Sequence, residues 1–213
     1  MKIIALAENI SNNKSIKAKH GLSLYIETLE HKILFDVGPD NTFIKNAKML
    51  NVNLKEVDMV VISHGHKDHG GGLKYFLEIN DKARIYVRRN AFEKHFTKLL
   101  GIHFNVGLDK KIINDRVIFT DAEYRITNNI LLFSSPNSKE YWPKGNMKLF
   151  NKDGFDDFSH EQNLILMENN IHYLFCGCGH TGILNIVNKA EKIVDKNIDY
   201  VCLLYTSDAA DDK

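Results

Sequence analysis

The sequence has few of the residues that cross-link or stiffen a chain. Its 213 residues include three cysteines, three prolines and one tryptophan. Cys176 and Cys178 lie too close together for a disulfide framework, and an odd number of cysteines cannot all pair. Free thiols are typical of a reducing compartment, so a cytoplasmic location is expected.

Long apolar runs and a large net charge are also missing. No stretch approaches the ~18 apolar residues of a membrane-spanning helix, and the apolar start of the chain ends at Glu8 without a signal-peptide cleavage pattern. The formal net charge of +1 gives no electrostatic reason to expect nucleic acid or a membrane as a partner. A chain that is 44% hydrophobic and 26% charged has the composition of one globular domain.

Histidine, by contrast, is concentrated at one point. His64, His66 and His69 stand with Asp68 within six positions, and three glycines follow at 70–72. Residues 57–63, directly before the cluster, form a short run rich in apolar and β-branched side chains, which indicates a buried strand. The residues after the glycines, 73–79, have helical spacing. The cluster therefore lies where a strand gives way to a helix, the place where α/β sheets bind ligands.

Neutral imidazoles and carboxylates are the ligands that zinc and iron take in proteins. His64 and His66 are two positions apart in extended backbone, so both can face one ion. Asp68 and His69 begin the next helix and suit a second ion. A histidine-rich surface turn is the alternative, and the buried strand before the cluster argues against it.

The rest of the chain predicts antiparallel strands joined to strand–helix units. Helices are expected over 39–50, 73–79, 91–100 and 181–194. Strands are expected over 2–10, 21–28, 32–38, 57–63, 83–87, 163–167, 171–175 and 198–205, with a close antiparallel series at 117–119, 124–127 and 130–133. Residues 101–116 are expected to be irregular, and 134–159 to form a long polar loop. Two sheets packed face to face with helices outside is the simplest arrangement, with the site at one edge.

These residues resemble a known family. His-x-His-x-Asp-His after a strand is the hallmark of the metallo-β-lactamase superfamily, and Leu34–Gly38 resembles its second hallmark. The stretches around His20, His64, His160 and Gly177-Cys178-Gly179-His180 are similar to the branch that contains the 7,8-dihydropterin-6-yl-methyl-4-(β-D-ribofuranosyl)aminobenzene 5′-phosphate synthases. The resemblance implies an α/β fold: a four-layer αββα sandwich of two mixed β-sheets with helices outside.

The resemblance also implies a site for one or two metal ions, with zinc expected and iron or manganese as alternatives. By that resemblance His64, His66 and His180 hold one ion. Asp68 and His69 hold the second, and Asp68 also acts in catalysis by orienting water.

Four further residues have open roles. Asp36 is expected to be structural near the site. Cys178 is either a thiolate ligand or a small residue at a tight strand end. His160 is an extra ligand, a substrate contact or a surface residue, and His20 is either a site wall or a surface residue. The remaining histidines have no partner in sequence and are expected to lie outside the site: His31, His95, His103 and His172.

The family expects a last histidine ligand after the final strand, where this chain has Leu203–Thr206. We therefore expect a domain over 1–201 that is C-terminally incomplete, a non-native tail over 202–213, and a second metal with one ligand fewer.

Together these features predict a metal-dependent hydrolase or transferase that activates water or a phosphate-type leaving group on a small anionic substrate. Lys67, Arg88 and Arg89 are candidate anion contacts. The alternative is a non-catalytic metal-binding or sensor protein with an incomplete site. A di-iron redox protein is a weaker rival, because such proteins on this fold have Glu where this chain has His66. A homo-oligomer is compatible with the sequence, which does not decide the point.

Overall fold

The computed structural model describes residues 1–134 and 140–204. The first sheet has the strand order β1-β2-β3-β4-β5-β8. Its strands are β1 (Lys2–Ala7), β2 (Ser23–Glu27), β3 (Lys32–Phe35), β4 (Met59–Val61), β5 (Arg84–Arg88) and β8 (Val117–Thr120). The first three pair antiparallel, and the last four pair parallel. The parallel strands are connected through α1 (Thr42–Met49), η1 (Leu54–Glu56), α2 (Lys67–Gly70), α3 (Leu73–Ile79), η2 (Arg89–Phe92) and η3 (Lys110–Ile112).

The second sheet has the strand order β15-β14-β13-β10-β9. Its strands are β9 (Glu123–Thr127), β10 (Ile130–Phe133), β13 (Asn163–Glu168), β14 (Ile171–Phe175) and β15 (Tyr200–Cys202). The pair β13–β14 forms the predicted hairpin, and α4 (Ile183–Val194) connects β14 to the parallel strand β15.

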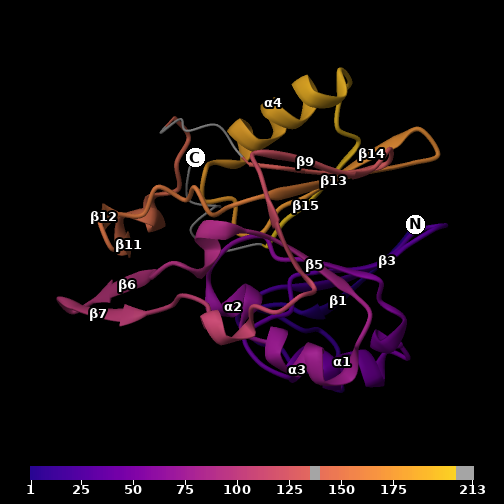
Figure 1. The fold of residues 1–213 in the computed structure, drawn as a ribbon, viewed down its shortest axis with the longest axis horizontal. Coiled ribbons are helices and arrows are strands. Elements are labelled where there is room, and N and C mark those ends of the chain that lie inside the picture. Colours follow the sequence, from indigo (N-terminus) through magenta and orange to yellow (C-terminus); the bar gives the residue numbers. More distant parts are fainter. Residues whose placement is uncertain (135–139, 205–213) are drawn as a thin grey trace.

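The two sheets lie face to face, with α1 and α3 outside the first and α4 outside the second (Figure 1). Alternating residues of one strand belong to different cores: Val60 packs with the residues of α1 and α3, whereas Val61 packs between the sheets. On the second sheet, Leu164 faces the other sheet and Ile165 faces α4. Strands buried on both faces read as continuous apolar runs, which is why they were recognisable in the sequence. The predicted four-layer sandwich is confirmed.

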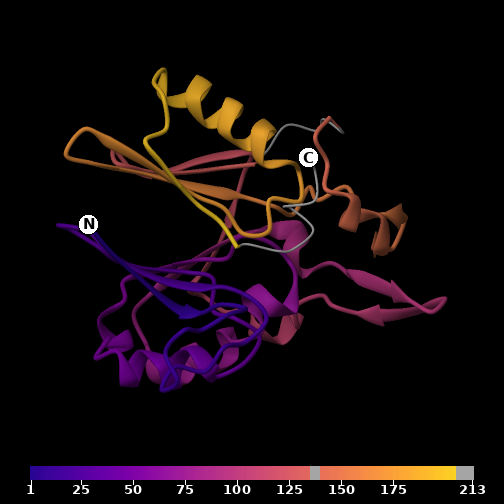
Figure 2. The ribbon, with the colours of Figure 1, turned by 180° about the vertical axis from the view of Figure 1, so that it is seen from behind.

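A third, four-stranded sheet projects from one side of the sandwich (Figures 1 and 2). It consists of β6 (Phe96–Leu99), β7 (Ile102–Asn105), β11 (Leu149–Asn151) and β12 (Gly154–Phe155). The predicted helix over 91–100 is therefore wrong, and so is the expectation that 101–116 is irregular. Leu100 and Gly101 both have positive φ, 50° and 83°, and this backbone geometry closes a tight β-hairpin.

Two other segments differ from expectation. The strand at 117–119 does not continue an antiparallel series, because β8 pairs in parallel with β5 of the first sheet. The segment 134–159 contains η4 (Lys144–Lys148) and the hairpin β11–β12, while residues 135–139 lie outside the described residues.

The last described residues pack with the domain. Cys202 pairs with Phe175 at the end of β15, and Leu204 is buried between the two sheets. The predicted non-native tail otherwise falls on 205–213, which lie outside the described residues. None of the helices in the described ranges is both long and apolar enough to cross a bilayer.

Candidate metal centre

The centre forms at one edge of the sandwich, where β3 and β4 end and β13 begins. His64 follows β4 after Ser63, and His69 lies in the short helix α2 that comes next. His180 arrives from the second sheet, in the turn between β14 and α4. Residues more than a hundred positions apart are thus brought to one point by the packing of the two sheets.

His64, His66 and His180 form a triangle of imidazoles. Ring centroids are 4.6 Å apart for His64 and His66, 5.0 Å for His64 and His180, and 5.1 Å for His66 and His180. Each ring has a buried Nε2 atom without a hydrogen-bond partner among the described residues. A buried polar atom without a partner costs free energy, so three together indicate that these atoms are set to bind something else.

Hydrogen bonds fix the tautomers of two of these rings. The Ser63 hydroxyl donates to Asp36 and lies 2.9 Å from Nδ1 of His64, so it accepts the proton of that nitrogen. Nδ1 of His180 lies 2.9 Å from Oδ1 of Asn146, whose amide nitrogen donates to the His180 carbonyl. Both rings therefore carry the proton on Nδ1 and leave the Nε2 lone pair free, the form that binds metals.

The environment keeps these imidazoles neutral. Burial, followed by the neighbouring imidazoles, holds the pKa of His64 and of His66 well below the ordinary value. The same causes lower the pKa of His180 to about 3. The ring of Phe158 stacks on that of His180, with 4.4 Å between the ring centroids and 12° between the ring planes. This contact supports the orientation of the imidazole.

A second group lies beside the triangle and consists of Asp68, His69 and Cys178. Nε2 of His69 lies 3.1 Å from Sγ of Cys178 and 3.4 Å from the Asp68 carboxylate. The ligand atoms of this group all lie within 4.8 Å of one another, and so do those of His64, Cys178 and His180. Cys178 is a member of both of these sets, whereas the ligand atoms of His66 lie within the same distance of those of His95, Asp156 and His160.

The charges of Asp68 and His69 support each other. Burial opposes the ionisation of Asp68, but His69 and His66 outweigh it and lower the pKa of the carboxyl. Burial by itself would lower the pKa of His69. The neighbouring Cys178, Asp68 and Asp36 outweigh burial, so the pKa of His69 lies well above the ordinary value. Burial raises the pKa of the Cys178 thiol, against the opposing effect of His69.

Asp36 links the two groups. Its side chain is fully buried and accepts hydrogen bonds from the Ser63 amide at 2.7 Å and from the Ser63 hydroxyl at 2.7 Å. The same carboxylate lies 2.6 Å from Nδ1 of His69, which it orients through that nitrogen. The structure therefore places Asp36 beside the centre, in contact with Ser63 and His69.

His160 is buried, with 1% of its surface exposed, so it is not a surface residue. Its Nδ1 accepts the Gly65 amide proton at 2.9 Å, and its Nε2 lies 3.3 Å from Asp156. Burial, the largest effect, lowers the pKa of this imidazole. With both nitrogens engaged, His160 holds the loop between His64 and His66.

The expectation that His95 lies outside the site is wrong. It is buried, its ring centroid is 3.9 Å from that of His160, and its Nδ1 lies 2.7 Å from Asp156. No pattern in the sequence indicates this contact, because His95 and Asp156 are distant in the chain and the pairing of β6 with β11 in the third sheet brings them together.

Glu161 was also missed. It is completely buried and accepts hydrogen bonds from the His180 amide, the Thr181 amide and the Thr181 hydroxyl. Burial raises the pKa of this carboxyl. Its position directly after His160 was the only available signal. Glu161 fixes the turn that carries His180.

A pocket of about 310 Å³ opens onto the centre. One wall consists of metal-centre residues, and the other comes from β6, η4 and β11 and includes Thr97, Asn146 and Lys148. His20 lines the rim, with 73% of its side chain exposed and Nε2 3.5 Å from Asp68. Lys148 is the cation that lines this pocket, and the sequence did not single it out.

The predicted anion contacts lie elsewhere. Arg88 donates to the carbonyl of Thr120, and Arg89 stacks on the ring of Phe119. Lys67 donates to the carbonyl of Asn105 on the outer side of the centre.

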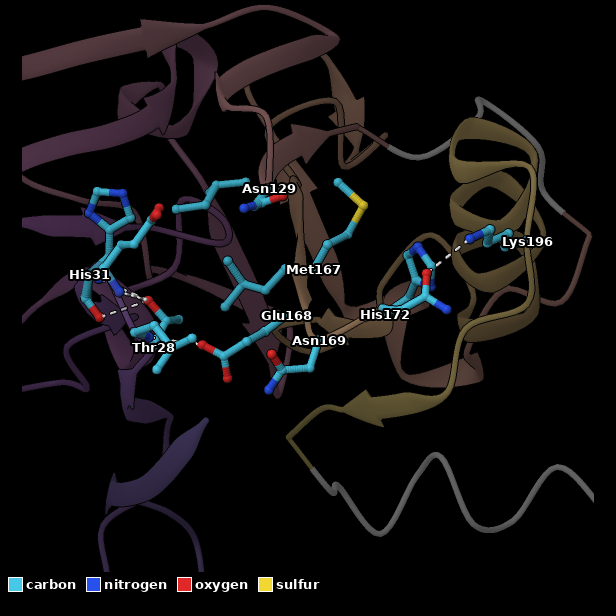
Figure 3. A pocket seen from close by; sticks show the side chains of 13 residues that line it. Thr28, His31, Asn129, Met167, Glu168, Asn169, His172 and Lys196 are labelled. Atoms are coloured by element: carbon cyan, nitrogen blue, oxygen red, sulfur yellow. Dashed lines mark hydrogen bonds between the residues drawn. The ribbon is translucent and has the colours of Figure 1, made fainter.

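A separate hollow of about 430 Å³ lies at the opposite ends of β2 and β13 (Figure 3). His31 and His172 line it, and none of the three imidazoles of the triangle is among its lining residues. His103 lies on β7, where its ring packs on Phe150. These three histidines are outside the centre, as expected.

The comparisons with known proteins agree with this geometry. The sequence profile of the metallo-beta-lactamase superfamily matches residues 17–134. A 7,8-dihydropterin-6-methyl-4-(beta-D-ribofuranosyl)-aminobenzene-5'-phosphate synthase of Methanocaldococcus jannaschii is 28% identical, over 95% of this chain and 76% of its own length. An uncharacterised protein of the same organism is 32% identical, over 84% of this chain and 70% of its own length.

Solved structures lead to the same family. A metal-dependent hydrolase of the beta-lactamase superfamily superposes with a TM-score of 0.79 at 26% identity, over 95% of this chain and 75% of that one. A profile match to more than half of the chain, together with a four-layer sandwich and a histidine cluster at its edge, leads to one conclusion. This chain belongs to the metallo-β-lactamase superfamily.

Proposed function

We propose that this chain is a metal-dependent hydrolase or transferase that acts on a small anionic substrate at a mononuclear or dinuclear centre. The observation that carries the proposal is the set of three buried Nε2 atoms of His64, His66 and His180, which have no hydrogen-bond partner within residues 1–134 and 140–204. Neutral imidazoles with fixed tautomers fit zinc, and iron and manganese are the alternatives.

The second ion would be held by Asp68, His69 and Cys178. A thiolate is a soft ligand and favours zinc over manganese. The residues of both groups therefore fit a pair of divalent ions.

A divalent ion at such a centre supplies Lewis acidity toward a phosphoryl or carbonyl oxygen and lowers the pKa of water. The chain's own residues provide the rest. The Asp68 carboxylate accepts a proton of the attacking water and aligns it with the substrate. Lys148 faces the same pocket and balances the negative charge of the substrate. Val106, Pro143 and Leu149 contribute apolar side chains to the wall of the pocket.

The relatives support the choice of substrate class. The methanogen relative is named for making a phosphorylated pterin compound, and the solved relative is named a metal-dependent hydrolase. A pocket of about 310 Å³ suits a small molecule, and drug-sized ligand pockets begin at about this volume.

The decisive experiment combines metal analysis with an activity assay. The purified protein is expected to contain one to two equivalents of a divalent metal and to hydrolyse bis(p-nitrophenyl) phosphate. A chelator should abolish the activity, and added zinc, manganese or iron should restore it in a preferred order. Absence of bound metal would sink the proposal. Bound metal without any activity would favour the non-catalytic metal-binding alternative.

A further expectation concerns Asn146, which fixes the tautomer of His180 by two hydrogen bonds. Asn146→Ala should weaken metal affinity by about 10–100-fold, the usual effect of removing a group that orients a metal-binding histidine. Competition with a fluorescent zinc chelator measures this affinity. Met147→Ala is the matched control, because Met147 is the exposed next residue. Equal affinities for the two variants would contradict the role of Asn146.

A further inference from the structure

A third, larger hollow lies beside α2 and α3. Its volume is about 850 Å³, and it is bounded by α3, by the segment after η2 and by the segment 105–112. It is lined by five lysines: Lys67, Lys74, Lys94, Lys110 and Lys111. We call it the lysine groove. Only two acidic residues, Glu93 and Asp109, line it as well.

These lysines come from four separate segments of the chain, so they are not a single run of charge. In the described part of the chain, none of the five takes part in a salt bridge. Other lysines of the protein do: Lys19 pairs with Asp40, and Lys189 with Glu123. The groove thus gathers unpaired positive charge in a protein whose net charge is only +1.

Aromatic and apolar residues also line the groove. Tyr75, Phe92, Leu108 and Ile112 line it, and Nζ of Lys74 lies 4.7 Å from the centroid of the Tyr75 ring. Ammonium groups beside aromatic and apolar side chains suit an organic anion better than a bare inorganic ion, because both parts of such a ligand find a partner.

The groove adjoins the metal centre. Val106 lines the metal pocket, whereas its neighbours Asn105 and Gly107 line the groove. The amide of Lys67, the residue between the metal-centre residues His66 and Asp68, donates to the Val106 carbonyl at 2.8 Å. One backbone segment therefore forms the wall between the two hollows.

We propose that the lysine groove binds a small organic molecule that carries two or more phosphate groups. Lysine ammonium groups bind phosphate as mobile point charges, and several converging lysines select for several phosphates. This site is separate from the proposed catalytic reaction and does not depend on a bound metal.

Binding is tested by calorimetry at low ionic strength with ATP, tripolyphosphate and inorganic phosphate. ATP is expected to bind more tightly than tripolyphosphate, and inorganic phosphate most weakly. Removing an exposed charge partner typically costs about threefold in affinity, so Lys74→Ala/Lys110→Ala/Lys111→Ala should weaken ATP binding by roughly thirtyfold. Added salt should reduce the difference in ATP affinity between this triple variant and the unmodified protein.

Three controls make the result specific. Lys152→Ala removes an exposed lysine outside the groove and should leave ATP binding unchanged. His180→Ala removes a proposed metal ligand and should also leave it unchanged, which excludes binding of the phosphates to the metal. The triple variant should keep the metal content and melting temperature of the unmodified protein. Failure of the lysine-groove proposal is therefore distinguishable from failure of the proposed catalytic function.

Equal ATP affinity for the triple variant and the unmodified protein would overturn the proposal. So would a loss of ATP binding in His180→Ala, since the phosphates would then be bound at the metal centre. A single-stranded oligonucleotide that binds more tightly than ATP would also overturn it, because it would assign the groove to a polymer.

Discussion

Replacing His66 with alanine is expected to abolish tight metal binding at the imidazole triangle while the fold survives. His66 supplies one of three buried Nε2 atoms that have no hydrogen-bond partner in the described part of the chain, so its removal breaks no hydrogen bond of that atom there. The loss of metal affinity should exceed the roughly 10–100-fold that follows removal of a residue that hydrogen-bonds to a metal ligand. Metal content after dialysis and hydrolysis of bis(p-nitrophenyl) phosphate should both fall close to background.

The control for this variant is His103→Ala, which removes an imidazole on β7 outside the centre. Circular dichroism and thermal unfolding should be similar for both variants and for the metal-free unmodified protein. Unfolding of the His66 variant alone would show that His66 has a structural role. Retention of a full complement of metal would contradict its assignment as a ligand.

The parts of this centre that were predictable from sequence are the local ones. His64, His66, Asp68 and His69 are neighbours along the chain, and the buried strand β4 fixes where they begin. Strand periodicity likewise revealed the two sheets, since each central strand packs on both faces. His180 was found only because the stretch around it resembles a family.

The parts that were missed depend on contacts between distant segments. Asp156 meets His95 and His160 through the third sheet, and the helix predicted over 91–100 concealed that sheet. Helical spacing and a short hairpin fit the same apolar residues there, and the turn at Leu100 decides in favour of the hairpin through its positive φ. Single-sequence patterns contain no information on which carboxylate will face which imidazole.

Replacing Asp36 should affect the imidazole triangle and the group of Asp68, His69 and Cys178 at once. Asp36→Ala removes three hydrogen bonds inside the sandwich. It leaves the buried Ser63 amide without its acceptor, and Nδ1 of His69 keeps only the longer 3.4 Å contact with the Ser63 hydroxyl. Such a change costs about 3 kcal/mol or more in unfolding free energy. Asp36 also has φ 58°, a region that alanine adopts less readily than asparagine. Chemical denaturation of the metal-free protein measures this cost.

Asp36→Asn separates the electrostatic role from the structural one. Asparagine tolerates the positive φ, and its carbonyl can still accept the Ser63 amide proton. Its NH₂ group, however, faces Nδ1 of His69, where the carboxylate accepted a proton. His69 must then carry its proton on Nε2, which leaves no lone pair there for a metal.

Metal content should therefore fall most at the group of Asp68, His69 and Cys178, and by less at the imidazole triangle, which Asp36 reaches only through Ser63. The unfolding free energy of Asp36→Asn should lie between those of the unmodified protein and Asp36→Ala. Equal metal content in Asp36→Asn and the unmodified protein would show that the tautomer of His69 does not control metal binding. Equal loss of stability in both variants would show that the carboxylate serves the fold alone.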